Sequence, residues 1–181
     1  FRDAFGTPAM RDVFSDHSLV ARYIDVEVAL ARAQARCGVI PAEAAEVIAR
    51  ESQLGRIDFE HMRHETDIVG YPILPLVHQL VAMCGEAGRY VHWGATTQDI
   101  MDTANVLQVR AALDIVDADI RALRAILADL AKKHRDTPMA GRTHLQQALP
   151  VTFGYKAAIW LAMFERHQQR LAELRERVLV V

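Results

Sequence analysis

Two short polar loops hold the side chains of this chain that are best suited to chemistry. The first runs His92-Trp93-Gly94-Ala95-Thr96-Thr97-Gln98-Asp99, and the second runs Gly141-Arg142-Thr143-His144-Leu145-Gln146-Gln147. Each precedes a long stretch of helix-forming residues. Hydroxyl and amide groups in such loops donate hydrogen bonds to anions, and a histidine transfers protons near neutral pH. The loops therefore suggest a site that orients an anionic substrate.

The first loop has two interpretations. Thr96 and Asp99 stand three positions apart ahead of a helical pattern, as in the capping box of a helix N-terminus. Such a start also offers free backbone N–H groups at the positive end of the helix dipole, where a carboxylate binds well. Thr97 and Gln98 would add donors there. A run of this kind is more often only a cap, so the first loop alone does not identify a site.

The second loop is more informative. His144 stands beside Thr143 and close to Gln146, ahead of a helix that we expect to start with Pro150. General acids and bases are often found in such loops, although a single histidine is usually structural. Two loops of this kind, each at the start of a long helix, favour one composite site.

The composition excludes several classes of partner. Lys and Arg number 21 and Asp and Glu 23, a formal net charge of −2, so there is no basic excess for nucleic acid or an anionic membrane. No apolar run reaches the roughly 20 residues of a membrane span. Cys37 and Cys84 lack disulfide-framework or zinc-ligand spacing and fit a reducing cytoplasm. We expect no cofactor.

A metal site is also not expected. His61, His64 and Glu65 could share one face of a short helix. Further ligands are not apparent, and a solvated helix face is the favoured interpretation. We predict that no metal is bound.

The elements that position the two loops are expected to be helices. Apolar residues alternate in steps of three and four from about Gln98 to His134, and again from Trp160 to Val181 after a polar loop that ends at Pro150. Upstream we expect three shorter helices, a helix capped by Asp58, and an extended piece. The three helices cover about Leu19–Arg36, Pro41–Arg50 and Leu76–Met83, and the extended piece covers Arg89–Trp93.

The predicted fold class is all-α. Residues 1–95 form an N-terminal helical domain with the first loop at its end, and residues 96–181 begin a central bundle of long helices. The two long helices would each measure about 45 to 55 Å at 1.5 Å per residue, more than one compact domain of this size needs. We therefore expect other subunits to cover their apolar faces.

The motifs resemble a known superfamily. HWGATTQDIMDTA is similar to the first shared segment of the fumarase/aspartase superfamily, in its branch of adenylosuccinate lyases and 3-carboxy-cis,cis-muconate cycloisomerases. GRTHLQQALPVTFGYK is similar to the second segment. TPAMRDVFSD and EVALARAQARCGVIP look most like the cycloisomerases. The resemblance implies a homotetramer of long helices in which loops from three subunits build each active site.

The resemblance also implies a reaction. A base removes the proton beside a carboxylate of a succinyl-type polycarboxylate, and an aci-carboxylate carbanion forms. A C–N or C–O bond then breaks to give fumarate or a related unsaturated acid. Oriented donors on the carboxylate are the main electrostatic requirement.

By this resemblance, site roles fall on residues of both loops. His144 protonates the leaving group, and the other positions bind substrate. Those substrate-binding positions are His92, Thr96, Thr97, Gln98, Asp99, Thr143 and Gln146.

Two departures from the family pattern bear on the substrate. Adenylosuccinate lyases carry a second histidine where this chain has Thr66, which disfavours a purine substrate. Many bacterial cycloisomerases have tryptophan where this chain has His144, which favours a lyase. A lactonising cycloisomerase and a non-catalytic helical assembly module stay open as alternatives. The family's third segment, a serine loop that supplies the base, is expected beyond Val181, so residues 1–181 alone should be inactive.

Overall fold

The computed structural model describes residues 3–180 and confirms the all-α prediction, with one small two-stranded sheet added. The chain forms two compact units, one reaching Val109 and the other running from Arg110 to Val180. The domain boundary predicted between residues 95 and 96 stays a prediction. Among the described residues we find no helix whose length and apolar character would together suffice to span a membrane.

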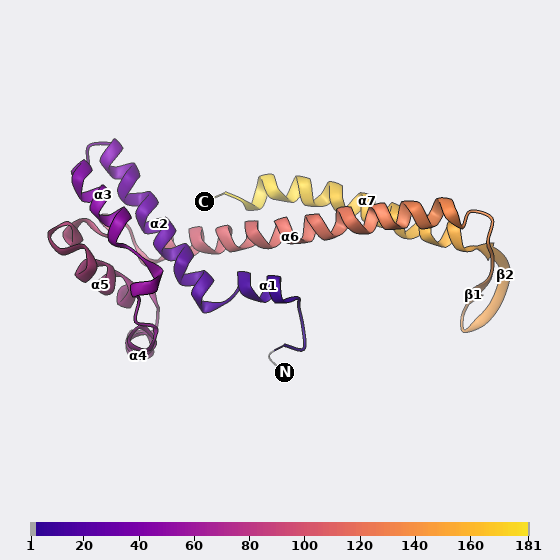
Figure 1. The fold of residues 1–181 in the computed structure, drawn as a ribbon, viewed down its shortest axis with the longest axis horizontal. Coiled ribbons are helices and arrows are strands. Elements are labelled where there is room, and N and C mark those ends of the chain that lie inside the picture. Colours follow the sequence, from indigo (N-terminus) through magenta and orange to yellow (C-terminus); the bar gives the residue numbers. More distant parts are fainter. Residues whose placement is uncertain (1–2, 181) are drawn as a thin grey trace. The chain divides into compact units, whose positions relative to one another are not determined.

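The first unit is a cluster of helices (Figure 1). Its most deeply buried side chains include Ile48, Leu76, Leu80 and Ile100. Ile100 lies on the first turn of the long helix α6, so the core of this unit fixes the start of α6 and the loop before it. The elements are α1 (Pro8–Val13), α2 (Asp16–Arg36), α3 (Ala42–Glu51), η1 (Leu54–Arg56), α4 (Phe59–Val69), α5 (Ile73–Cys84), η2 (Gly85–Tyr90) and the beginning of α6 (Thr97–Lys133).

Local signals placed most of these helices correctly. Ser15 caps α2 by accepting from the backbone N–H of Ser18, and Asp58 caps α4 in the same way. Helix α5 begins earlier than predicted, because Pro75 stands in its first turn, where the missing N–H costs no intrahelical hydrogen bond.

The extended piece predicted for Arg89–Trp93 is wrong. The chain forms the 3₁₀ helix η2 up to Tyr90 and then a turn. The physical reason is a close approach of Gly88 to α5: a Cβ on Gly88 would come within 2.4 Å of the Val81 carbonyl oxygen. This glycine lets the coil fold back on α5 instead of extending.

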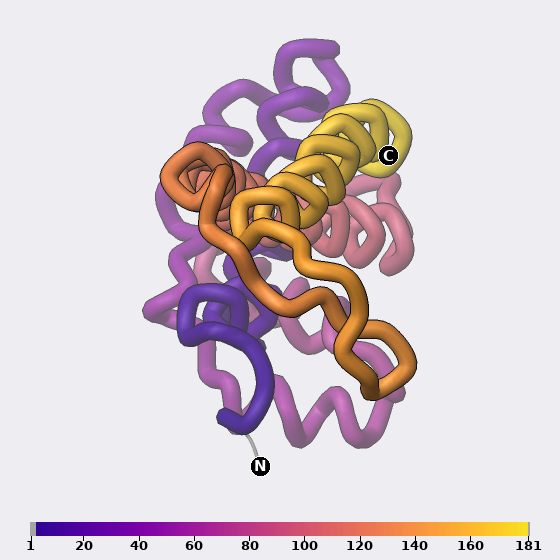
Figure 2. Tube along the Cα trace, turned by 90° about the vertical axis from the view of Figure 1, so that its right-hand side faces the viewer, coloured from indigo at the N-terminus to yellow at the C-terminus, as the bar shows by residue number. Residues whose placement is uncertain are grey.

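In the second unit, the later part of α6 and the antiparallel helix α7 (Phe153–Val178) lie side by side (Figures 1 and 2). Arg124 donates from Nε to Glu165 at 2.9 Å, and Arg175 pairs with Asp114 at 2.8 Å. The predicted periodic helices are confirmed over the described residues. The predicted end of the second helix, Val181, lies outside them.

The polar loop predicted up to Pro150 is instead a β-hairpin. Strand β1 (Pro138–Thr143) pairs antiparallel with β2 (Gln146–Thr152), and Thr143 faces Gln146 across a two-residue turn. Figure 2 shows the two strands of the hairpin extending away from the ends of the helices. Pro150 belongs to β2 and does not start the helix. Helix α7 begins three residues later, capped by Thr152.

A glycine at the start of α7 makes the connection between hairpin and helix tight. The N–H of Gly154 donates to the His134 carbonyl at 2.8 Å. A Cβ at Gly154 would lie 2.6 Å from the Ala131 carbonyl oxygen and 2.7 Å from the Cα of Arg135. Both are backbone atoms, so the clash is not relieved by a side-chain rotation.

We therefore expect Gly154→Ala to lower the free energy of unfolding by about 1–3 kcal/mol, the usual cost of overpacking. Urea unfolding followed by circular dichroism measures this. The control is Gly55→Ala, because a Cβ there meets nothing within 4 Å. Equal stability of the two variants would contradict the close contact.

Candidate active site

Helix α2 holds the first loop at two points. Gln34 Nε2 donates to the Trp93 carbonyl at 2.5 Å, and His92 Nδ1 lies 2.6 Å from Glu27 Oε1. Glu27 and Gln34 are seven residues apart, so both lie on one face of the helix. The loop itself is sharply bent, with φ of 56° at His92 and 69° at Gly94. These contacts fix the place of the His92 ring.

The Glu27–His92 contact is the most buried charged pair of the first loop. Glu27 is 1% exposed and the His92 side chain 19%. The hydrogen bond that His92 donates to Glu27 raises the pKa of His92 above its ordinary value of 6.5. Burial opposes this rise, and the charges of Glu27 and Asp99 add to it. A carboxylate accepts hydrogen bonds, so Nδ1 carries a hydrogen and Nε2 is left for another partner.

The start of α6 is capped by its own sequence. The Thr96 N–H donates to Asp99 Oδ2 at 2.8 Å, and the Asp99 N–H donates to the Thr96 carbonyl at 3.1 Å. This supports the capping interpretation of the pair. The Thr96 N–H is one of the groups that the sequence predicts to be free for a substrate anion. In the structure it donates to the Asp99 carboxylate instead. The predicted contact of Asp99 with substrate stays a prediction.

The remaining polar residues of the first loop lie near this helix start. Thr96 and Gln98 are exposed, and Thr97 is half-buried. Gln98 Nε2 donates to Asp102 Oδ1 at 2.5 Å, one turn further along the helix. His92 stands four residues before Thr96 in the chain. The assignment of these residues to a substrate carboxylate stays a prediction.

The second group of predicted residues lies at the tip of the hairpin in the other unit. Thr143, His144 and Gln146 are all exposed. The turn itself is His144-Leu145, with φ of 43° and 61°. Positive φ costs an L-residue about 1–2 kcal/mol, and glycine or asparagine is usual in such turns. Backbone strain of this kind often occurs at functional positions.

His92 and residues 96–99 thus lie in the first unit. Thr143, His144 and Gln146 lie together in the second unit. Reasoning from the sequence missed Glu27 and Gln34. A signal was available: Glu27 continues the three-and-four spacing of the buried residues Val20, Ile24 and Ala31 on α2. A carboxylate on a buried stripe is rarely found without a partner.

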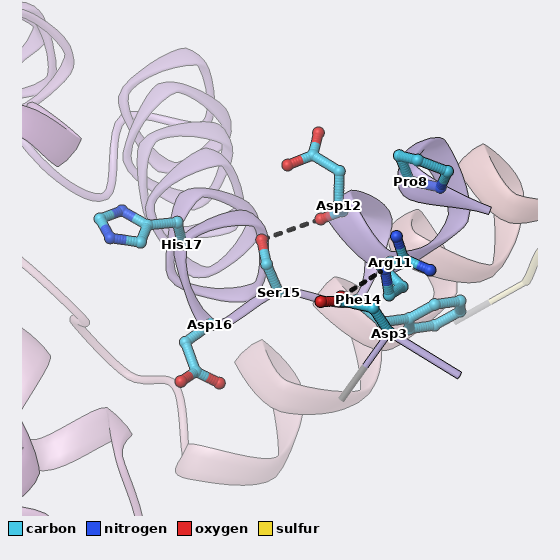
Figure 3. Close-up of a pocket in the computed structure, with 8 residues that line it drawn as sticks. All are labelled: Asp3, Pro8, Arg11, Asp12, Phe14, Ser15, Asp16 and His17. Carbon is cyan, nitrogen blue, oxygen red and sulfur yellow. Dashed lines mark hydrogen bonds and ion pairs between the residues drawn. The ribbon is translucent and has the colours of Figure 1, made fainter. Parts of the chain in front are cut away.

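A hollow of about 650 Å³ lies apart from both loops, where α1 meets α2 (Figure 3). None of the predicted site residues line it. Two polar contacts lie along it: Arg11 pairs with Asp3 at 3.2 Å, and the Ser15 hydroxyl donates to the Asp12 carbonyl at 2.8 Å. We therefore assign no substrate to it.

Around the metal candidate on α4, two histidine rings lie near the Glu65 carboxylate. Nε2 of His61 lies 3.6 Å from one oxygen of Glu65, and Nδ1 of His78 lies 3.7 Å from the other. His64 is exposed. Within residues 3–180 no three His, Cys, Asp or Glu side chains gather as metal ligands.

Comparison with known proteins gives consistent relatives. A protein family described as lyase matches residues 4–181. The N-acetyl-S-(2-succino)cysteine lyase of Dickeya dadantii is 49% identical over 176 residues, which are 97% of this chain and 39% of that protein. Relatives named trans-aconitate decarboxylase 1, from Mycosarcoma maydis, and adenylosuccinate lyase, from Pyrococcus abyssi, also match.

Two solved structures share the fold. A fumarate lyase from Mesorhizobium sp. BNC1 is 60% identical with a TM-score of 0.89, covering 95% of this chain and 41% of that one. The 3-carboxy-cis,cis-muconate lactonizing enzyme from Pseudomonas putida is 45% identical with a TM-score of 0.96, covering 100% and 41%. The chain thus spans about two fifths of the length of these proteins.

Proposed function

The chain belongs to the lyase family, within the fumarase/aspartase superfamily, and from this premise we propose that the protein carrying it is a lyase acting on a succinyl-type dicarboxylate. The reaction removes a proton beside one carboxylate and expels an amine, thiol or alcohol. Fumarate or a related unsaturated acid is the product. No cofactor takes part in this scheme.

The observation that carries the proposal is the paired histidine beside the start of a long helix. Glu27 accepts the Nδ1 hydrogen of His92, and this hydrogen bond raises the pKa of His92 above its ordinary value. In this proposal the oriented His92 ring and the donors of Thr96, Thr97 and Gln98 bind a carboxylate and stabilise the negative charge that grows on it in the aci-carboxylate. We assign this binding role to the first loop.

The second loop supplies the acid in this proposal. His144 is exposed at the hairpin tip, so its ring is free to reach a leaving group. Thr143 and Gln146, the pair that closes the turn, are proposed to contact the same substrate. The family resemblance assigns the base to a serine loop outside residues 1–181.

We further propose a homotetramer with shared active sites. Large apolar side chains are exposed in the second unit on α6, on α7 and on the hairpin. They include Leu123, Ile126, Leu145, Leu149, Ile159, Trp160 and Met163. So much exposed apolar surface is typical of an interface. In the chain, most of the 37-residue helix α6 lies between the two loops, which favours sites built by more than one copy.

We also propose a cytoplasmic location. Cys37 and Cys84 are both free thiols, and Cys37 is exposed. An exposed thiol that stays reduced suits a reducing compartment. Nucleic acid and membrane are not proposed as partners, given the net charge of −2.

A lactonising cycloisomerase is the second candidate. Its support is the lactonizing enzyme of Pseudomonas putida, with a TM-score of 0.96 over the whole chain. Both reactions pass through a carbanion beside a carboxylate, so the same donors serve either one. A helical assembly module is not proposed, because the matched relatives carry enzyme names.

Product analysis separates these functions. The purified protein is incubated in parallel with S-succinyl and N-succinyl amino acids, adenylosuccinate and carboxymuconate, and products are followed by chromatography. We expect fumarate from at least one succinyl compound. Lactone from carboxymuconate, without fumarate from any succinyl compound, would select the cycloisomerase. A folded protein that converts none of the succinyl compounds would oppose the proposed lyase.

A further inference from the structure

We propose that Glu27 is a positioning residue, which orients the His92 ring so that Nε2 is presented to a substrate carboxylate. This inference deepens the proposed function and rests on it for the identity of the substrate. Glu27 itself is not assigned any contact with substrate. It lies on α2, 65 residues before its partner in the chain.

The first argument is the place of Glu27 in the core. Its neighbours at helical spacing, Ile24 and Ala31, are buried apolar residues, and Glu27 is as buried as they are. Burying a carboxylate costs free energy that a single ion pair rarely restores, and an apolar residue of similar size is often more stabilising. Stability alone therefore does not explain a glutamate here.

The second argument is geometric. Oε1 of Glu27 lies 2.6 Å from Nδ1 of His92, whose backbone has a φ of 56°. Gln34, two turns along the same face of α2, holds the next residue by its carbonyl. Ring and backbone are thus fixed by one rigid helix. Precise placement of this kind is what a substrate-binding group requires.

The third argument concerns unsatisfied acceptors. Among the described residues, three buried side-chain oxygens have no hydrogen-bond partner, and two of these are Oε2 of Glu27 and Oε1 of Gln34. Both therefore come from the face of α2 that holds this loop. Buried acceptors are nearly always paired. Together with the Glu27–His92 and Gln34–Trp93 contacts, these two oxygens show that α2 turns polar groups toward this loop.

The pairing has a consequence for pH. The charged groups that act on His92 are Glu27 from α2 and Asp99 from α6, and both favour the imidazolium. Because folding raises this pKa, the protonated pair stabilises the fold fully below the ordinary value of 6.5. That stabilisation is lost as the pH rises through the folded-state pKa. We expect carboxylate binding by His92 to weaken over the same range of pH.

The experiment compares Glu27→Gln, His92→Asn and the control Asp25→Asn. Asp25 is on the same helix but exposed, and it pairs with Arg22. Long-range ¹H–¹⁵N spectra recorded across pH report the tautomer and pKa of His92. Calorimetry measures the affinity for succinate, an unreactive dicarboxylate.

For Glu27→Gln we expect a lower His92 pKa, a mixed tautomer and succinate binding weakened by about 10- to 100-fold, the usual loss when the carboxylate orienting a functional histidine is removed. His92→Asn should weaken binding at least as much. Asp25→Asn should resemble the wild type. Glu27→Asp, which keeps the charge but is one methylene shorter, should retain part of the pKa rise, and it replaces Glu27→Gln if that variant does not fold.

The outcomes separate this proposal from the function on which it rests. If the pKa and tautomer of His92 do not respond to Glu27→Gln or Glu27→Asp, Glu27 does not position the ring, whatever happens to binding. If they respond as expected but His92→Asn binds succinate like the wild type, Glu27 does set the state of His92, and the substrate-binding role proposed for the first loop is wrong.

Discussion

Replacing His144 with alanine is expected to lower turnover by about 10²- to 10⁴-fold while the protein stays folded. Loss of a positioned proton donor typically costs that much. The imidazole is exposed at a hairpin tip, so its removal sacrifices no packing within the chain. Alanine is also a non-glycine residue, so the strain at a φ of 43° is carried over and not relieved.

The measurement is kcat and KM on the substrate found by product analysis, together with circular dichroism. The basic limb of the pH–rate profile should change as well, because the acid that defines it is gone. His64→Ala serves as the control, since His64 is an exposed histidine outside both loops. Unchanged kinetics in His144→Ala would show that His144 is structural.

A single arginine on α6 should break the assembly. Ile126 is 55% exposed within the chain, so Ile126→Arg leaves the helices of one copy intact. In a symmetric oligomer the change is repeated in every copy, and each buries an unpaired charge. We expect dissociation, and loss of nearly all activity if loops from different copies share one site.

Light scattering after size exclusion gives the mass of the assembly, and circular dichroism reports helix content. The control is Val39→Arg, which places the same side chain at another apolar position that is also 55% exposed, but outside the second unit. It should keep the mass and activity of the wild type. A wild-type protein that is a stable monomer, or an Ile126→Arg variant of unchanged mass, would argue against the proposed assembly.

The helices could be predicted because their signals are local. Ser15 and Asp58 cap the helices that follow them, and the three-and-four rhythm of α6 and α7 depends on neighbouring residues only. The hairpin could not, because its turn is His144-Leu145 and lacks the Asn-Gly type of pair that usually marks such a turn. Backbone pairing of the two strands, not their side chains, defines it.

For the candidate site, too, only what local sequence signals show could be predicted. Both loops carry recognisable motifs, so His92 and His144 could be proposed from the sequence and its family resemblance, and their roles stay predictions. Their partners could not, because a contact such as Glu27–His92 joins residues far apart in the sequence. The spacing of Glu27 within a buried stripe was the one available hint, and only the fold shows which group it meets.

At the hairpin turn, selection for stability and selection for activity should favour different residues. A library randomised at positions 144 and 145 and selected for thermal stability would favour asparagine and glycine, which tolerate positive φ. The same library selected for turnover would return histidine at 144 if His144 is the acid. Comparing the two selected populations would show whether stability or turnover determines the residue at each of these two positions.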